Sequence, residues 1–496
     1  KRLIDKPQGE FWGYQTEGNY DIKDCSSAAH LYSKQIASGE AFTDVTYKHT
    51  LAQIKNLADN AYCSGINELV VCAVAYQPWV GKDDGHIKIN TANGRQYVLG
   101  RMNPFWTMSK PFWDYQARCS WLLRQGKPVC DICLYLGDNI PMRTLSHKIP
   151  HIPSGYDFDS FTTDALLNRM SVKDGLIVLP DGVSYRMMIL PSGEDLTEEV
   201  RKLIASFERQ GAVIYHPDTV PRTLAEAMHD AGLQPDVEAP KVPNLNFCHR
   251  RTAQEDIYFL NNHSDQSVSD SFRFRVDAVS VELWKPATGE RKPIRINRDK
   301  GGASVRLSLA PRESVFVVFS RSESEQNVTE RDRQQVSEQT IGGNWSVQFD
   351  PALGGPDQPV VLDTLSDWSK NEDIRIRYYA GTAICRNTFR MDAVKRQASY
   401  YLSLPLLNTV AEVVVNGKSA GVVWCSPYSL DITRFVRKGI NSLELRISNT
   451  LWNRLVGDAK FQEEQRIYWQ TYPIAKPTDE LVPSGVAGNI SIICVR

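Results

Sequence analysis

The sequence predicts a multidomain protein in which α/β domains are followed by all-β domains. The 496-residue chain is too long for one hydrophobic core, so about three or four domains are expected. Over residues 1–245, strand-like and helix-like segments alternate, which is typical of parallel sheets. From Asn246 onward the helical spacing stops, and short apolar segments are separated by turn residues as in β-sandwiches.

Residues 1–126 contain three strand–helix units. Gly9–Tyr14 and Gln35–Thr43 resemble strands, and the apolar run Glu68–Tyr76 has the pattern of a strand buried on both faces. Helices are predicted by apolar spacing at 24–34, 47–62 and 110–125. Because three units cannot close an eight-stranded barrel, we expect the C-terminal part of a (β/α)8-type barrel. The other units would precede Lys1, which we expect to be a cut point.

Four further segments complete the predicted organisation. Residues 127–245 again alternate strands and helices, with a strand at Val129–Leu136 and a helix at Glu198–Arg209, which predicts a small doubly wound, flavodoxin-like domain. Residues 246–325 predict a small β-sandwich, and the polar residues 326–340 predict a linker. Residues 341–496 predict a jelly-roll sandwich, in which Asn416-Gly417 marks a hairpin turn.

Composition excludes several classes of protein. The formal net charge is −1, which does not favour binding to nucleic acid or to a membrane surface. No apolar run approaches the roughly 20 residues of a spanning helix. The 10 cysteines are too scattered for a disulfide framework. Cys130 and Cys133 have C-x-x-C spacing, but we expect them in a buried strand, facing opposite sides, rather than on a metal. No metal ligands are predicted.

Two acidic residues lie at predicted strand ends, where α/β folds bind ligands. Glu10 and Glu40 are separated by about one βα unit, so their strands should be neighbours. Hydrolysis of a glycosidic bond needs two carboxyl groups, placed roughly 6.5–9.5 Å apart in inverting enzymes and about 5–5.5 Å apart in retaining ones. We therefore consider Glu40 and Glu10 as candidate catalytic residues. The alternative is that both are rim residues in solvated ion pairs.

Aromatic and amide side chains are predicted near the same strand ends. Rings stack on sugars and amides bond hydroxyl groups, so these residues are candidate substrate-binding groups, although loop packing would explain them equally well. They are Trp12, Tyr76, Gln77, Trp79 and Trp106. For His30 we expect packing on the barrel, and for Asp157 and Asp159 we expect turn and cap roles.

The amino-acid sequences of several segments resemble those of glycoside hydrolase family 106. The segments are GEFWGY, CSSAAHLYSK, GEAFT, AYQPW, residues 109–138 and residues 153–191. Residues 342–356, VVVNGKSAGVVWCSPYSLDIT and SNTLWNRLVGD resemble the galactose-binding-like sandwich that this family shares with family 2 hydrolases. The resemblance implies an inverting, calcium-dependent α-L-rhamnosidase acting on a terminal deoxysugar of an oligosaccharide or polysaccharide. It implies carboxylates at Glu10 and Glu40, either of which could be the acid or the base, and calcium ligands upstream of Lys1.

The resemblance also carries a departure and several open alternatives. Cys72 and Tyr76 occupy a segment that is often rich in histidine in the family. Imidazole groups can bond sugar hydroxyls or titrate, so this difference puts specificity for rhamnose in question. A degenerate, non-catalytic carbohydrate-binding homologue is one alternative, and a glycosidase of other specificity, such as a β-galactosidase-like enzyme, is another. The family favours a periplasmic or cell-surface location. The N-terminal half could be present as a separate chain.

Overall fold

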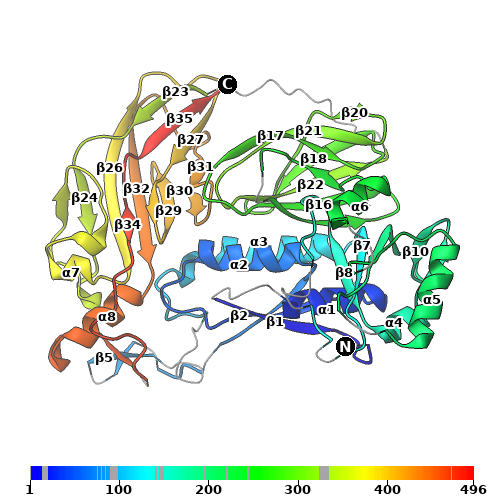
Figure 1. Ribbon diagram of the computed structural model, residues 1–496. Helices are drawn as coiled ribbons and strands as arrows, with labels where there is room; N and C mark the ends of the chain where they lie inside the picture. The colour runs from blue at the N-terminus through cyan, green and yellow to red at the C-terminus, as the bar shows by residue number, and fades with distance from the viewer. Residues whose placement is uncertain are drawn as a thin grey trace. The chain divides into compact units, whose positions relative to one another are not determined.

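The computed structural model shows a mixed α/β chain with many β-sheets (Figure 1). It describes residues 2–13, 20–74, 76–79, 81–83, 85–89, 99–139, 142–144, 150–193, 196–218, 222–242, 245–322, 335–470 and 472–496. The chain divides into two compact units. Unit 1 comprises Lys1–Ala41, Asn56–Val70 and Tyr115–Thr329, and unit 2 comprises Phe42–Lys55, Val71–Asp114 and Glu330–Arg496. In the described part of the chain, no helix has the length and apolarity that crossing a membrane requires.

The first sheet has the strand order β1-β2-β3, with β1 at Gln8–Trp12, β2 at Ser38–Thr43 and β3 at Glu68–Val71. The Ser38 N–H donates to the Pro7 carbonyl, and the Glu68 N–H donates to the Ala37 carbonyl. These bonds join the beginnings of the strands, so all three run in the same direction. The helices of this region are α1 (Tyr20–Leu31), α2 (Leu51–Cys63) and α3 (Lys110–Leu123). The described residues do not close this sheet into a barrel.

The third strand is shorter and more exposed than the sequence predicts. The expected strand ran to Tyr76 and was buried on both faces, but β3 ends at Val71. Val70 is 40% exposed and Val74 is 76% exposed, so the expectation of burial on both faces is wrong. Among the described residues β3 is an edge strand, and apolar composition alone does not reveal which strands lie at an edge.

A second parallel sheet of unit 1 has the order β13-β12-β7-β8. Its strands are β7 (Ile132–Tyr135), β8 (Phe158–Phe161), β12 (Met187–Ile189) and β13 (Ile214–Tyr215). Its helices are α4 (Thr163–Asn168), α5 (Glu198–Arg209) and α6 (Leu224–Asp230), and a small antiparallel sheet comprises β9 (Ser171–Lys173), β10 (Leu176–Val178) and β11 (Ser184–Tyr185). The Thr197 hydroxyl caps α5, which buries Val200, Ile204 and Phe207. The predicted bounds of this helix are therefore confirmed.

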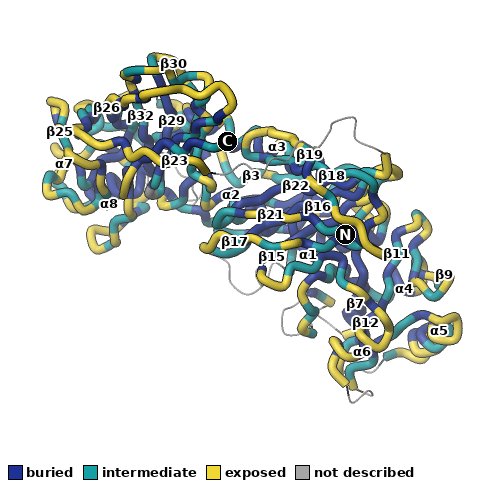
Figure 2. The backbone as a smooth tube through the Cα atoms, turned by 90° about the horizontal axis from the view of Figure 1, so that it is seen from above, coloured by how far each residue is buried: buried dark blue, intermediate teal, exposed yellow. Residues whose placement is uncertain are grey.

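The rest of unit 1 consists of two further sheets with the orders β19-β18-β22-β16-β15-β6 and β14-β17-β21-β20. Tyr258, Phe274 and Phe319 are buried in the core, where their rings meet edge to face or tilted. Figure 2 shows that most residues along β16 and β22 are buried. The strands are β6 (Lys127–Pro128), β14 (Val237–Glu238), β15 (Leu245–Arg251), β16 (Glu255–Asn262), β17 (Val268–Phe274), β18 (Ser280–Lys285), β19 (Glu290–Pro293), β20 (Asn297–Asp299), β21 (Gly302–Leu309) and β22 (Ser314–Ser320).

Unit 2 contains two antiparallel sheets with the orders β25-β24-β26-β32-β29-β30 and β23-β35-β27-β31. Asn416 and Gly417 have φ of 51° and 77° between β29 and β30, which confirms the predicted hairpin turn. The expected linker 326–340 falls partly outside the described residues, and its remainder forms β23. The strands are β23 (Gln335–Thr340), β24 (Trp345–Gln348), β25 (Val360–Leu362), β26 (Thr382–Met391), β27 (Ser399–Ser403), β29 (Thr409–Val415), β30 (Lys418–Val423), β31 (Ser429–Asp431), β32 (Gly439–Asn449) and β35 (Ser491–Val495).

Smaller elements complete unit 2. Strand β33 (Tyr468–Gln470) pairs in parallel with β5 (His86–Ile89), which pairs antiparallel with β4 (Lys82–Asp83). This small sheet joins two segments of unit 2 that are far apart in the sequence. The helices are α7 (Ile374–Arg377) and α8 (Trp452–Lys460), and β28 (Leu406–Leu407) pairs with β34 (Gly485–Val486).

Candidate functional site

The register of the first sheet places Glu10 beside Glu40. In a parallel pair, the 2.9 Å bond from the Ser38 N–H to the Pro7 carbonyl sets Ser38 beside Gln8. Two residues further along each strand, Glu40 therefore lies beside Glu10. The prediction that these residues occupy neighbouring strands is confirmed by the strand order.

The two glutamates also share one face of the sheet. A Cβ on Gly9 would lie 2.5 Å from the Asp21 carbonyl oxygen of α1, and a Cβ on Gly39 would lie 3.0 Å from the Phe11 ring. Gly9, Phe11 and Gly39 thus face the layer that contains α1. Because side chains alternate along a strand, Glu10 and Glu40 face the opposite side, together with Trp12.

Both carboxylates are partly buried, as the intermediate exposure of Glu10 and Glu40 shows. Within the described part of the chain, neither carboxylate forms a hydrogen bond or an ion pair. Their neighbour Glu68, on β3, differs: its carboxylate lies 2.6 Å from Lys6 Nζ and 3.2 Å from Arg124 Nη2. Among the described residues, ion pairs of the kind that the alternative expects for Glu10 and Glu40 are found at Glu68.

The chain turns sharply directly after Glu40. Phe42 and Asp44 have φ of 72° and 56°, in the left-handed region that is costly for a residue with a Cβ atom. Phe42 is buried and its ring lies 6.5 Å from that of Phe112. Packing thus holds a strained backbone at the carboxyl end of β2, a location where functional residues are often found.

The other predicted sugar-binding residues belong to unit 2. Tyr76 is 79% exposed, and Arg101 Nη2 donates to the carbonyl groups of Gln77 and Trp79. Trp106 begins a short 3-10 helix and meets Trp113 edge to face at 6.3 Å. The structure therefore groups Glu10, Glu40 and Trp12 on one sheet face and places Tyr76, Gln77, Trp79 and Trp106 in the other unit.

Sequence reasoning missed a cluster of buried charged residues between α1 and β8. His30 Nδ1 lies 2.9 Å from Asp159, to which the Tyr185 hydroxyl also donates, and Lys23 Nζ donates to Asp157 at 2.7 Å. Burial would raise the pKa of Asp159, but His30 and Lys23 outweigh burial and lower it. The expected turn and cap roles for Asp157 and Asp159 are thus replaced by ion pairing. Charged residues on an otherwise apolar helix face were the only signal for this cluster in the sequence.

This cluster does not fit calcium. His30, Cys130 and Asp159 offer ligand atoms within 4.8 Å of one another. Calcium takes about 6–8 oxygen ligands, whereas two of these three groups supply nitrogen and sulfur. Burial raises the pKa of the Cys130 thiol well above its usual value. We therefore assign no metal to these residues.

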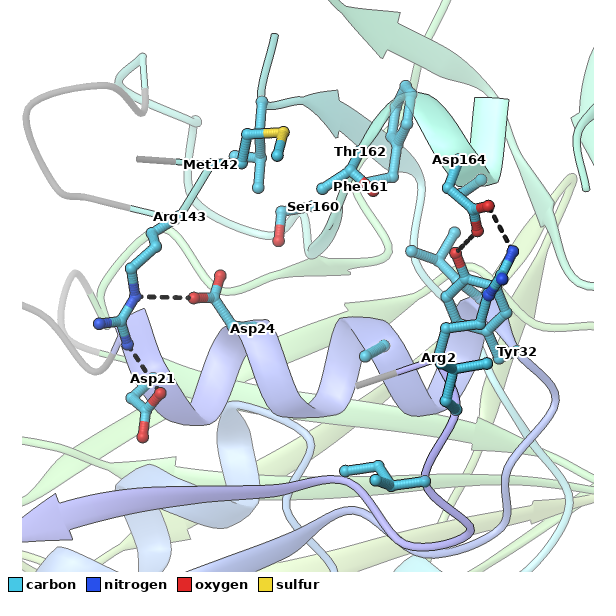
Figure 3. Close-up of a pocket in the computed structure, with 16 residues that line it drawn as sticks. Arg2, Asp21, Asp24, Tyr32, Met142, Arg143, Ser160, Phe161, Thr162 and Asp164 are labelled. Atoms are coloured by element: carbon cyan, nitrogen blue, oxygen red, sulfur yellow. Dashed lines mark hydrogen bonds and ion pairs between the residues drawn. The ribbon is translucent and has the colours of Figure 1, made fainter. Parts of the chain in front are cut away.

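A cavity of about 590 Å³ lies along α1 (Figure 3). At one end, Arg143 pairs with Asp21 at 2.8 Å and with Asp24 at 3.5 Å. At the other end, Asp164 pairs with Arg2 and accepts a hydrogen bond from Tyr32. Asp21 also accepts a hydrogen bond from the backbone N–H of Glu10, so one end of the cavity is linked to the backbone of that candidate residue.

Comparisons with known proteins agree with this architecture. A rhamnosidase structure from Novosphingobium sp. PP1Y superposes with a TM-score of 0.86 and 26% identity over 99% of this chain and 51% of that chain. A protein of Formosa agariphila named "Putative beta-glucuronidase" is 29% identical over 357 residues, which are 64% of this chain and 30% of its own length. The chain thus spans about half the length of the solved relative and less than a third of the other.

The family comparison covers most of unit 1. The model of the α-L-rhamnosidase family matches residues 1–221 and 217–298, which is more than half of the chain. The matched residues include both candidate carboxylates and the sheet that carries them. The chain therefore belongs to glycoside hydrolase family 106, the α-L-rhamnosidase family.

Proposed function

We propose that Glu10 and Glu40 are the two catalytic carboxylates of an inverting α-L-rhamnosidase that removes terminal rhamnose-like sugars from an oligosaccharide or polysaccharide. One observation carries this proposal: two partly buried carboxylates lie side by side on one sheet face, without a partner among the described residues. A carboxylate that is not held by an ion pair remains available to transfer a proton or to activate water.

The two groups would divide the chemistry between them. One carboxylic acid protonates the glycosidic oxygen as the bond breaks, and the other carboxylate removes a proton from the water that attacks the anomeric carbon from the opposite face. Paired strands fix the backbones about 4.8 Å apart, and the side-chain torsions set the final separation of the carboxyl groups. Either residue suits either role, and Glu40 is the one that we assign first.

The finer architecture belongs to the same proposal. Three parallel strands connected by helices support a part of a (β/α) barrel, and the paired sheets of unit 2 support a galactose-binding-like jelly roll. Calcium remains a prediction from the family resemblance, and no catalytic step of this proposal passes through it. The periplasm or cell surface is the location that the resemblance favours.

Conservative variants of the full-length protein test the proposal with a chromogenic α-L-rhamnoside. Glu40→Gln and Glu10→Gln each remove the ability to transfer a proton, so turnover should fall at least about a hundredfold. Glu68→Gln is the matched control, because Glu68 lies on the next strand but is held by Lys6 and Arg124. Near-normal turnover in either of the first two variants would exclude that residue. Proton NMR of the first product formed distinguishes inversion from retention.

A second specificity is favoured by one comparison. The relative from Formosa agariphila carries a β-glucuronidase name, so the same carboxylates could serve another glycoside. A chromogenic β-glucuronide assayed beside the rhamnoside decides between these activities. Calorimetric binding of rhamnose without release from either substrate would instead support a non-catalytic carbohydrate-binding homologue.

A further inference from the structure

The backbone at Glu10 is held by a side chain rather than by a neighbouring strand. Strand β1 bonds to β2 through the Pro7 carbonyl, so the N–H of Glu10, an odd number of residues away, points away from β2. At that position Asp21 Oδ2 accepts the hydrogen bond at 2.8 Å. The first turn of α1 therefore fixes the backbone from which the candidate carboxylate projects.

Asp21 is fixed in turn by Arg143. The guanidinium group donates through Nη2 to Asp21 Oδ1 at 2.8 Å, so the two oxygens of Asp21 hold two different groups. Figure 3 shows Arg143 reaching over the first turns of α1 toward Asp21 and Asp24. Both aspartates are partly buried, with side-chain exposures of 25% and 14%.

Close packing leaves little freedom at this contact. A Cβ on Gly9 would meet both the carbonyl oxygen of Asp21 at 2.5 Å and the Cα of Ile22 at 3.1 Å. Strand β1 thus lies directly against α1. Because both elements have little room to shift, the hydrogen bond between Asp21 and the edge of β1 is able to fix the position of Glu10.

We infer that Asp21 is a positioning residue for Glu10, and that Arg143 orients Asp21 for this task. The inference rests on the proposed role of Glu10. Misplacing a catalytic group by about 1 Å costs up to about a hundredfold in rate, so loss of the contact acts on turnover more than on substrate binding.

Variants of the full-length protein, assayed with a chromogenic α-L-rhamnoside, separate positioning from general stability. Asp21→Ala should lower kcat at least tenfold while KM changes less than threefold. Asp21→Asn should recover part of kcat, because its amide oxygen still accepts the Glu10 N–H while its NH2 group cannot accept from Arg143. Asp24→Ala is the matched control: Asp24 also contacts Arg143 and accepts a bond from the Thr144 N–H, but among the described residues it accepts no hydrogen bond from β1.

The outcomes are distinguishable. Equal losses in Asp21→Ala and Asp24→Ala, or a normal kcat in Asp21→Ala when Glu10→Gln is inactive, overturn the positioning role and leave the proposed function intact. Normal turnover in Glu10→Gln removes the role of Glu10, and the inference about Asp21 with it. If circular dichroism shows that Asp21→Ala does not fold, the Arg143→Ala variant is the deciding test. Its kcat should be at least threefold lower than that of Asp24→Ala. Equal kcat values for these two variants would overturn the inference.

Discussion

His30 Nδ1 lies 2.9 Å from the Asp159 carboxylate, a buried hydrogen bond that joins α1 to β8 within unit 1. Both side chains are almost completely buried, at 7% and 0% exposure. The contact connects the helix that packs on β1 with the second parallel sheet. It therefore bears on stability around the candidate site rather than on the reaction.

Removing this imidazole should destabilise unit 1. His30→Ala leaves the buried Asp159 carboxylate with one hydrogen-bond partner fewer, and depriving a buried acceptor of its partner costs about 1–3 kcal/mol. Urea unfolding followed by fluorescence should show a clearly lower midpoint. The control is His229→Ala, since His229 is 91% exposed on α6 and its loss should leave the midpoint unchanged. Equal midpoints for the two variants would contradict the prediction.

The buried residue His249 should make stability depend on pH. Its Nδ1 lies 2.7 Å from Asp236 and its Nε2 lies 3.0 Å from Asp256. Burial would lower the pKa of His249, but the two carboxylates outweigh burial and raise it above the ordinary value of 6.5. For Asp256, burial acts upward, yet His249 and Arg251 lower its pKa from 3.8 to about 2.

The sign of the pH effect follows from these shifts. The raised pKa of His249 contributes stability that is complete below pH 6.5 and is lost as pH rises through the folded-state value. The lowered pKa of Asp256 contributes stability that is complete above pH 3.8 and is lost as pH falls toward 2. Urea midpoints measured across this range should fall above pH 6.5 in the wild type. In His249→Gln this part of the decline should disappear, and an unchanged profile would refute the assignment.

Adding one methyl group at Gly9 should disturb the candidate site. Gly9→Ala places a Cβ 2.5 Å from the Asp21 carbonyl oxygen, so β1 must shift away from α1. We expect turnover on the chromogenic rhamnoside to fall at least tenfold, because Glu10 is the next residue. Gly342→Ala serves as the comparison, since a Cβ there has no described atom within 4 Å. A Gly9→Ala enzyme with wild-type turnover would show that β1 tolerates the shift.

The cysteines should differ in their reactivity. All 10 are thiols in the structure, and Cys72 alone is partly exposed while the others are buried. Burial also raises the pKa values of Cys130 and Cys133 well above normal, which suppresses the reactive thiolate. Iodoacetamide should therefore modify Cys72 first in the native protein, as mass spectrometry of peptides would show. Early modification of Cys130 would contradict this order.

Local patterns were enough to predict several elements. The helix Glu198–Arg209 has its predicted bounds because a threonine cap and a regular apolar face determine it locally. The turn at Asn416-Gly417 depends only on two residues that accept positive φ. The neighbouring placement of Glu10 and Glu40 followed from their spacing by one βα unit.

Features that depend on distant residues could not be predicted in this way. The shared face of Glu10 and Glu40 is set by how tightly Gly9 packs on α1, and His30 meets a residue more than a hundred positions away. The exposure of Val70 depends on whether another strand covers β3, which composition does not encode. Strand β23 was assigned to a linker because its residues are polar, and only pairing with β35 makes it a strand.

That pairing has a consequence for how unit 2 assembles during synthesis. Strand β35 lies between β23 and β27, and it bonds to both along its whole length. The sheet therefore cannot form until β35 has been synthesised, because Gln335 pairs with Val495. The two flanking strands, β23 and β27, leave the ribosome much earlier. Closing so long a loop delays folding. This sheet should complete only after β35 has been synthesised, and the unpaired edges of β23 and β27 would need protection from aggregation until then.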